Sequence, residues 1–248
     1  MEDRLQKLAE RMKAVGYKEH WVRLTRKWVH ELQQRGVYCV DKFVRRLKRS
    51  TGGKDEREYW DILMEGRFAV ILARNGFSKI HIEYSDEGPD IKANWNRNAI
   101  WFDVTRKRSK ADEWEVPPED VKLPSGKPED IISRIQNKLK QLKPGEINII
   151  VLCSSTIAVD EHGVREAFKL IEQDPKEYEK LSGILFTNDW GIDIATMKQF
   201  YLFENKNASK PIGPRLADKL EYMHDQSAEE LQRNWQEVAT LLKAKGKQ

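Results

Sequence analysis

The stretch that decides the fold of this chain is residues 65–107, EGRFAVILARNGFSKIHIEYSDEGPDIKANWNRNAIWFDVTRK. It begins inside an apolar helical segment that starts near residue 56 and that Asn75-Gly76 ends. Apolar and polar residues then alternate in 79–84, 90–95 and 99–105, as they do in half-buried strands. The stretch predicts a helix followed by three short strands, the last two joined by a turn at 96–98.

Three carboxylates stand out in this stretch: Glu65 in the helix, Asp90 after Gly88-Pro89, and Asp103 in the middle of the third strand. A buried, unpaired carboxylate is costly, so each of them requires a partner. A divalent metal would serve, because Mg²⁺ is held by one or two carboxylates together with phosphate oxygens. Such a metal can activate water for phosphodiester cleavage. The alternative for Glu65 is an ion pair with an arginine.

Strand alternation also assigns side chains to faces. The third strand places Ile100, Phe102 and Val104 on one face and Trp101, Asp103 and Thr105 on the other. A helix predicted at 128–142 carries Lys138 within its apolar stripe. A lysine on a buried helix face is uncommon, although its stem can extend to the edge of the core.

The rest of the chain predicts further alternation of strands and helices. Strands are expected at 147–153, 183–187 and 200–203, and helices at 160–173, 214–224 and 228–244. The polar, proline-containing segment 108–128 is expected to be a loop, in which Trp114 is the aromatic residue best suited to stack on a base.

Positive charge is concentrated at one end of the chain. The net charge is +4, but residues 1–50 contain 14 Lys or Arg against 6 Asp or Glu, and the remainder contains 30 against 34. A basic segment beside a mildly acidic body indicates a phosphate-binding surface. A solvated helical surface is the alternative interpretation.

Three helices are predicted in this basic segment, at 3–15, 18–35 and 42–49, with Asp41 as a cap for the third. The third helix carries the outward basic residues Lys42, Arg45, Arg46, Lys48 and Arg49. We expect these to contact a DNA backbone rather than to read bases. Ser50-Thr51-Gly52-Gly53 is the clearest boundary signal, and it divides the chain into a helical module, 1–50, and an α/β domain, 55–248.

Composition excludes several other classes. The chain has 248 residues, 39% hydrophobic and 34% charged, and no apolar run of membrane-spanning length, so no membrane association is expected. Cys39 and Cys153 are the only cysteines, which argues against a disulfide framework and favours the cytoplasm. The five histidines form no metal-spaced pair, and no role is assigned to His81. Neither a phosphate-binding glycine loop nor a Gly-x-Ser-x-Gly motif is present.

Glu65 in a first helix, Pro89-Asp90, and Asp103 on a hydrophobic hairpin strand together resemble the PD-(D/E)xK nuclease superfamily. The resemblance covers residues 56–153 and implies a restriction-endonuclease-like fold, with an αβββαβ core around a mixed sheet. It also implies Mg²⁺ or Mn²⁺ bound by Asp90 and Asp103, with Glu65 completing the shell directly or through water. Arg106 and Lys107, at the end of the motif strand, are expected to contact nucleic acid.

One position departs from the family pattern. The motif lysine, which orients water and stabilises negative charge, is replaced by Thr105. A threonine can hold a water but carries no charge. Lys107, Lys92 and Lys138 are candidates to replace it, and the resemblance includes members with the lysine on a helix. Lys138 is favoured because its inward position otherwise lacks a purpose, and a snorkelling or ion-paired lysine is the alternative.

The expectation is therefore a metal-dependent DNA endonuclease with Glu65, Asp90, Asp103, Thr105 and Lys138 in its catalytic site. A double-strand cut needs two sites, which predicts a homodimer. The alternative is an inactive protein that keeps the nuclease fold and binds nucleic acid.

Overall fold

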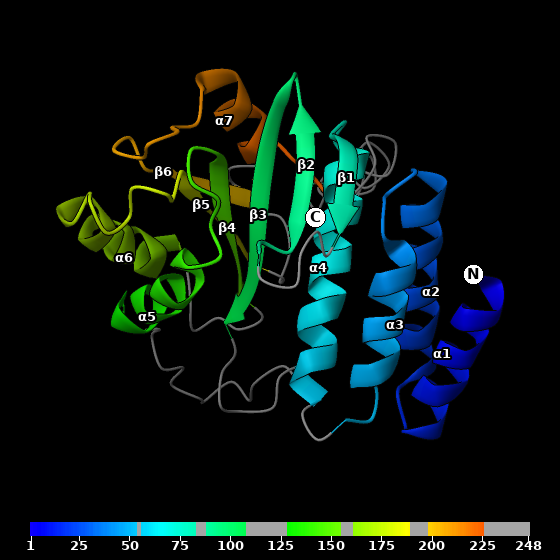
Figure 1. Ribbon diagram of the computed structural model, residues 1–248. Coiled ribbons are helices and arrows are strands. Elements are labelled where there is room, and N and C mark those ends of the chain that lie inside the picture. Colours follow the sequence, from blue (N-terminus) through cyan, green and yellow to red (C-terminus); the bar gives the residue numbers. More distant parts are fainter. Residues whose placement is uncertain (54–55, 83–87, 108–127, 155–160, 189–197, 226–248) are drawn as a thin grey trace, which may run out of the picture.

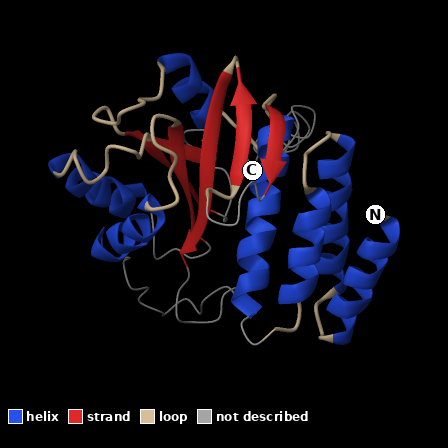
Figure 2. Ribbon diagram, viewed as in Figure 1, coloured by secondary structure: helices blue, strands red, loops and turns tan. Residues whose placement is uncertain are grey.

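A six-stranded sheet forms the middle of the molecule, with its strands side by side in chain order from β1 to β6. The computed structural model describes residues 1–53, 56–82, 88–107, 128–154, 161–188 and 198–225. Figure 1 shows helices flanking the sheet, α1 to α4 on one side and α5 and α6 on the other. The colouring of Figure 2 separates the central strands from these helical layers. The protein is thus a mixed α/β structure.

The strands are β1 (Ser78–Ile82), β2 (Ile91–Trp95), β3 (Asn98–Lys107), β4 (Ile147–Ser154), β5 (Gly183–Asn188) and β6 (Phe200–Glu204). β1, β2 and β3 pair antiparallel, β3, β4 and β5 pair parallel, and β6 is antiparallel to β5. The sheet is therefore mixed. Every residue of β4 is buried, as expected for a central strand covered on both faces.

The helices are α1 (Glu2–Ala14), α2 (Glu19–Gln34), α3 (Val40–Ser50), α4 (Glu56–Arg74), α5 (Pro128–Leu139), α6 (Glu161–Gln173) and α7 (Pro214–Glu221). In order, α4, β1, β2, β3, α5 and β4 form a helix, three strands, a helix and a strand. Among the residues that the structure describes, no helix is long and apolar enough to cross a membrane.

The sheet separates two hydrophobic cores. Phe102 and Val104 of β3 lie in the larger core, which α4 and the N-terminal helices cover. Ile150 and Leu152 of β4 face the smaller core beneath α5 and α6. Alternation along each strand explains the division, because neighbouring side chains point to opposite faces. Asp103 therefore points to the α5 side.

A two-residue turn sets the register of β2 on β3. Asn96 and Arg97 both have left-handed backbone conformations, with φ of 47° and 75°. Two consecutive residues with positive φ match a type I′ turn, whose twist suits antiparallel strands. The resulting register places Ile91 opposite Phe102.

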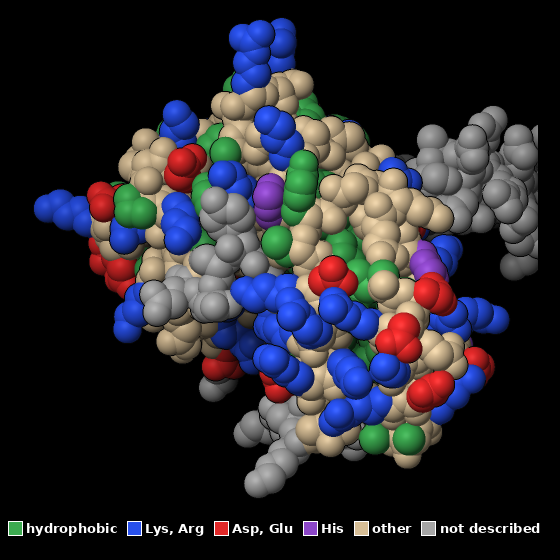
Figure 3. All heavy atoms as spheres, turned by 45° about the vertical axis from the view of Figure 1, so that its right-hand side comes forward, with side chains coloured by type: hydrophobic (Ala, Val, Ile, Leu, Met, Phe, Trp, Pro, Cys, Tyr) green, Lys and Arg blue, Asp and Glu red, His purple; other side chains and the backbone are tan. Residues whose placement is uncertain are grey.

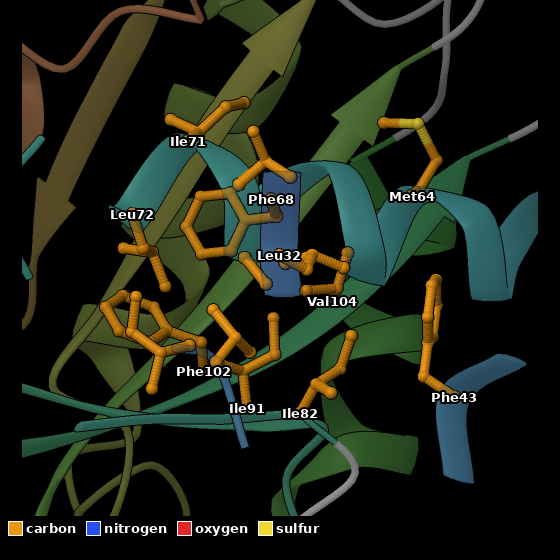
Figure 4. Packing of buried hydrophobic residues seen from close by; sticks show 14 of the residues in the cluster. Leu32, Phe43, Met64, Phe68, Ile71, Leu72, Ile82, Ile91, Phe102 and Val104 are labelled. Carbon is orange, nitrogen blue, oxygen red and sulfur yellow. The ribbon is translucent and has the colours of Figure 1, made fainter. Parts of the chain in front are cut away.

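The N-terminal helices pack on α4. Thr25 of α2 and Tyr59 of α4 share a buried hydrogen bond of 2.9 Å. Figure 4 shows Phe43 pointing from α3 toward α4. A Cβ added at Gly66 would lie 2.3 Å from Phe43 Cζ, so only glycine allows this approach. Residues of α1 to α3 and of the sheet consequently belong to one continuous core.

The predicted elements agree with the structure to within a few residues, with one local correction. Asp41 does not cap α3, because the helix begins at Val40 and its N-cap is Cys39, with φ of 65°. The predicted helix 128–142 ends earlier, at Leu139. The loop within 108–127, with Trp114, and the helix predicted at 228–244 lie outside the described residues.

Candidate active site

Asp103 is the buried centre of the candidate site. It lies on β3, its side chain is fully buried, and its Oδ1 is 2.7 Å from the Nζ of Lys138 on α5. Lys138 keeps a quarter of its side chain exposed and also donates to Gln141 at 3.3 Å. The charged end of an otherwise inward-facing lysine is thus held against a carboxylate in the sheet.

Asp90 lies beside Asp103 at the start of β2. Its Oδ2 accepts the backbone N–H of Val104 at 2.8 Å, which fixes the carboxylate next to the strand that carries Asp103. Burial, followed by the charge of Asp90, raises the pKa of Asp103 to about 7, although Lys138 opposes the shift. Two adjacent carboxylates that resist joint ionisation form a site suited to a cation.

The pKa of Lys138 also reflects the carboxylates around it. Burial acts to lower this pKa, but the charges of Asp103 and Asp90 outweigh burial and raise it. Glu65 contributes in the same direction. Lys138 is therefore a permanent ammonium at neutral pH, within electrostatic range of three carboxylates.

Glu65 reaches this cluster from α4 but is engaged by another residue. Arg46 of α3 donates to both of its oxygens, at 2.9 and 3.1 Å. The Glu65 side chain is 5% exposed and that of Arg46 is 39% exposed. This fork geometry is a strong form of ion pair. It links the basic helix α3 to a buried carboxylate of α4 whose charge also acts on Lys138.

The residues that follow Asp103 on β3 differ in burial and in their contacts. Thr105 is half-buried on the same strand face as Asp103. Arg106 is buried, 3.4 Å from Asp61 of α4, and its carbonyl accepts a hydrogen bond from Arg134. Arg106 was expected to contact nucleic acid, and in the structure it lies inside the fold. The side chain of Lys107 lies outside the described residues.

The outward face of α3 carries basic side chains. Arg45 and Arg49 are exposed, and Lys42 and Lys48 are half-buried. Figure 3 shows Lys and Arg side chains gathered over the N-terminal helices. Arg46, the partner of Glu65, belongs to the same helix.

The side chains of this region can be compared with the ligands that a metal ion requires. Within the described ranges, no group of three or more His, Cys, Asp or Glu side chains is arranged to hold one. The pair Asp90 and Asp103 remains, and two carboxylates with phosphate oxygens and water are a usual environment for Mg²⁺. Glu65 would have to leave Arg46 to join them.

No known protein family, curated protein or solved structure matched this chain in comparisons. Any function of the site must consequently be inferred from the residues of the site itself.

The alternative for Glu65, an ion pair with an arginine, is what the structure has, with Arg46 as the partner. Which arginine it is could not be predicted, because the pair joins two different helices and no local pattern signals it. One feature of this region was missed, the stack between Tyr38 and His81, which joins a loop to a strand. For this stack, strand alternation was the available signal, because it places the His81 side chain on the opposite face of β1 from Ile80 and Ile82.

Proposed function

We propose that the protein is a metal-dependent DNA endonuclease of the PD-(D/E)xK type. The observation that carries the proposal is the cluster of Asp90, Asp103 and Lys138, in which a lysine from a helix stands against the buried motif carboxylate. The order of α4, β1, β2, β3, α5 and β4 in a mixed sheet also supports it, since it corresponds to the restriction-endonuclease-like αβββαβ core.

Asp90 and Asp103 would hold Mg²⁺ or Mn²⁺. Bound there, the metal would supply Lewis-acid stabilisation of the phosphate and a more acidic water. The raised pKa of Asp103 fits this use, because a buried carboxylate beside another gains from a nearby dication. Glu65 would add a ligand, directly or through water, after exchange with Arg46.

The remaining residues have roles that follow from their charge and position. Lys138 offers an ammonium for the negative charge that develops on the phosphate, the role that Thr105 cannot fill. Thr105 offers a hydroxyl on the same strand face for positioning water. The basic face of α3 would hold the DNA backbone by charge, without reading sequence.

Cleavage of supercoiled plasmid DNA in Mg²⁺ or Mn²⁺ tests the proposal. Asp103→Asn and Asp90→Asn should abolish nicking while the circular dichroism spectrum remains that of the wild type. Asp218→Asn is the matched control, because Asp218 is an exposed carboxylate on α7. Wild-type rates in both site variants would refute the assignment.

A second candidate function is nucleic-acid binding without cleavage. The ion pair between Arg46 and Glu65 favours it, because this contact neutralises the carboxylate that would complete a metal shell. Calorimetric titration with Mn²⁺ separates the two functions. Heat of binding that is lost in Asp103→Asn supports the nuclease, whereas salt-sensitive DNA binding without Mn²⁺ binding supports the second function.

A homodimer and a cytoplasmic location belong to the nuclease proposal. Two copies would supply the two sites that a double-strand cut requires. Both cysteines are free thiols, as is usual in a reducing compartment. Sedimentation of the protein with and without DNA tests the dimer.

A further inference from the structure

Tyr38 is an exposed aromatic side chain held on a rigid support. Its ring lies parallel to that of His81, with a centroid separation of 4.3 Å and an interplanar angle of 11°. Its backbone is fixed to β1, because its N–H donates to the Ile80 carbonyl and its carbonyl accepts from the Ile82 N–H. Even so, 51% of Tyr38 remains exposed. One ring face is packed while much of the side chain is open to solvent.

The stack continues across the sheet as a row. His81 is the register partner of Lys92, and Lys92 is the partner of Trp101. Directly opposed residues share a face, and here the Nζ of Lys92 lies 4.8 Å from the Trp101 ring centroid. Tyr38, His81, Lys92 and Trp101 thus form a row of three rings and one ammonium group.

This row lies on the face of the sheet that carries the catalytic cluster. Trp101 is two residues before Asp103, and Lys92 is two residues after Asp90, so their side chains share that face. The rise along a strand and the spacing between strands place the backbone of His81 about 8 Å from that of Asp90. A stacked nucleic-acid strand covers this distance in two or three nucleotides, at a rise of about 3.4 Å each.

The electrostatic surroundings suit a nucleic-acid strand. α3 begins two residues after Tyr38, with the half-buried Lys42 in its first turn and the exposed Arg45 in the next. Burial and the charge of Lys92 lower the pKa of His81, so its imidazole is neutral at physiological pH. A neutral, flat support beside cations is the composition of a base-stacking platform rather than of a second phosphate site.

We propose that Tyr38, supported by His81, stacks on an unpaired base next to the scissile phosphate. The preferred substrate is then a nucleic acid with single-stranded character at the site, such as a single strand, a flap or a frayed end. This inference rests on the proposed nuclease function and names the substrate class of the same site. Paired bases are covered on both faces by their neighbours, so an intact duplex cannot use the platform.

The experiment measures binding in EDTA, where cleavage cannot occur. The probe is a short single-stranded DNA that contains 2-aminopurine, whose fluorescence falls on stacking, together with the same strand annealed into a duplex. Tyr38→Ala should weaken binding of the single strand at least about fivefold and remove the quenching. Binding of the duplex should change less than about twofold, because backbone contacts dominate it.

Matched variants separate stacking from stability. Tyr38→Phe keeps the ring and should retain affinity and quenching. Tyr38→Leu keeps apolar bulk without a flat ring and should behave as Tyr38→Ala. Tyr222→Ala is the surface control, since Tyr222 is 59% exposed beside Lys198 on the segment that ends α7.

The outcomes distinguish this inference from the nuclease proposal. Loss of single-strand binding and quenching in both Tyr38→Ala and Tyr38→Leu, with folded protein by circular dichroism, supports the platform even if no metal-dependent cleavage is found. Unchanged single-strand binding in Tyr38→Leu, or equal losses for single strand and duplex, overturns it even if plasmid is cleaved. A wild-type protein that does not quench 2-aminopurine also overturns it.

Discussion

The Nζ of Lys138 lies 2.7 Å from the Oδ1 of Asp103, a carboxylate in the middle of an apolar strand, and this contact joins helix α5 to β3. Two residues further along β3, on the same face as Asp103, stands the uncharged Thr105. The positive charge beside Asp103 therefore comes from a different element, the helix α5.

Removal of the lysine should impair cleavage more than folding. If the protein is the proposed nuclease, Lys138→Ala removes the ammonium beside the phosphate, and we expect plasmid cleavage to fall by about a hundredfold or more. Lys140→Ala removes an exposed lysine from the segment just after α5 and should leave the rate unchanged. The measurement is the initial rate of nicking at saturating Mg²⁺. Cleavage by Lys138→Ala at the rate of the control would contradict the role given to Lys138.

Asp103 should make stability depend on pH in metal-free buffer. Its pKa is about 7 in the folded protein, against an ordinary value of 3.8. Between these values the folded state retains a proton that the unfolded state has lost, so the free energy of unfolding falls as the pH rises. Below this window both states are protonated and the effect vanishes. The expected slope is up to about 1.4 kcal/mol per pH unit.

Urea unfolding at several pH values measures this slope. In Asp103→Asn, the free energy of unfolding should no longer fall as the pH rises from 3.8 to about 7. The wild type should therefore become less stable relative to this variant toward neutral pH. Asp218→Asn should retain the wild-type slope, because its carboxylate is exposed. Parallel profiles for the wild type and Asp103→Asn would show that Asp103 titrates normally.

Loss of Arg46 should leave a buried carboxylate without its main partner. We expect Arg46→Ala to lower the free energy of unfolding by about 2 kcal/mol, less than for a fully buried pair, because Arg46 is 39% exposed. Addition of Glu65→Gln should restore much of the loss, since the charge is then gone. Arg45→Ala, on the exposed side of the same helix, should change stability by less than about 0.5 kcal/mol. Additive effects of the two substitutions at the pair would argue against direct coupling.

The close approach of α3 and α4 predicts a steric effect. Gly66→Ala places a methyl group against the Phe43 ring and should destabilise the protein by about 1–3 kcal/mol. Phe43→Leu, added to Gly66→Ala, should recover part of this loss because the smaller side chain makes room. Thermal unfolding of the single and double variants gives the comparison. A neutral Gly66→Ala would mean that the two helices move apart at little cost.

The basic face of α3 predicts a salt dependence. If Arg45 and Arg49 each neutralise one DNA phosphate, removal of both should reduce the slope of log affinity against log salt by about 2. The change should be the same for unrelated DNA sequences, because phosphate contacts carry no sequence information. Fluorescence anisotropy at several salt concentrations tests this. An unchanged slope would place the DNA on another surface.

The helices and strands were predictable because their signals are local. Alternation in 99–105 correctly separated Phe102 from Asp103, since successive side chains of a strand must point to opposite faces. The inward position of Lys138 followed from helical periodicity in the same way. The cap of α3 was predicted wrongly, because Asp41 has the preferred chemistry but the chain turns earlier, through a left-handed Cys39.

By itself, the sequence determined which segments form helices and strands, which residues face inward, and that charged groups lie among them. Only the tertiary structure decided how those groups are paired. Lys138 meets Asp103 because α5 packs beside β3, and Arg46 engages Glu65 because α3 packs on α4. Such pairings depend on the packing of whole elements, whereas periodicity describes a single element.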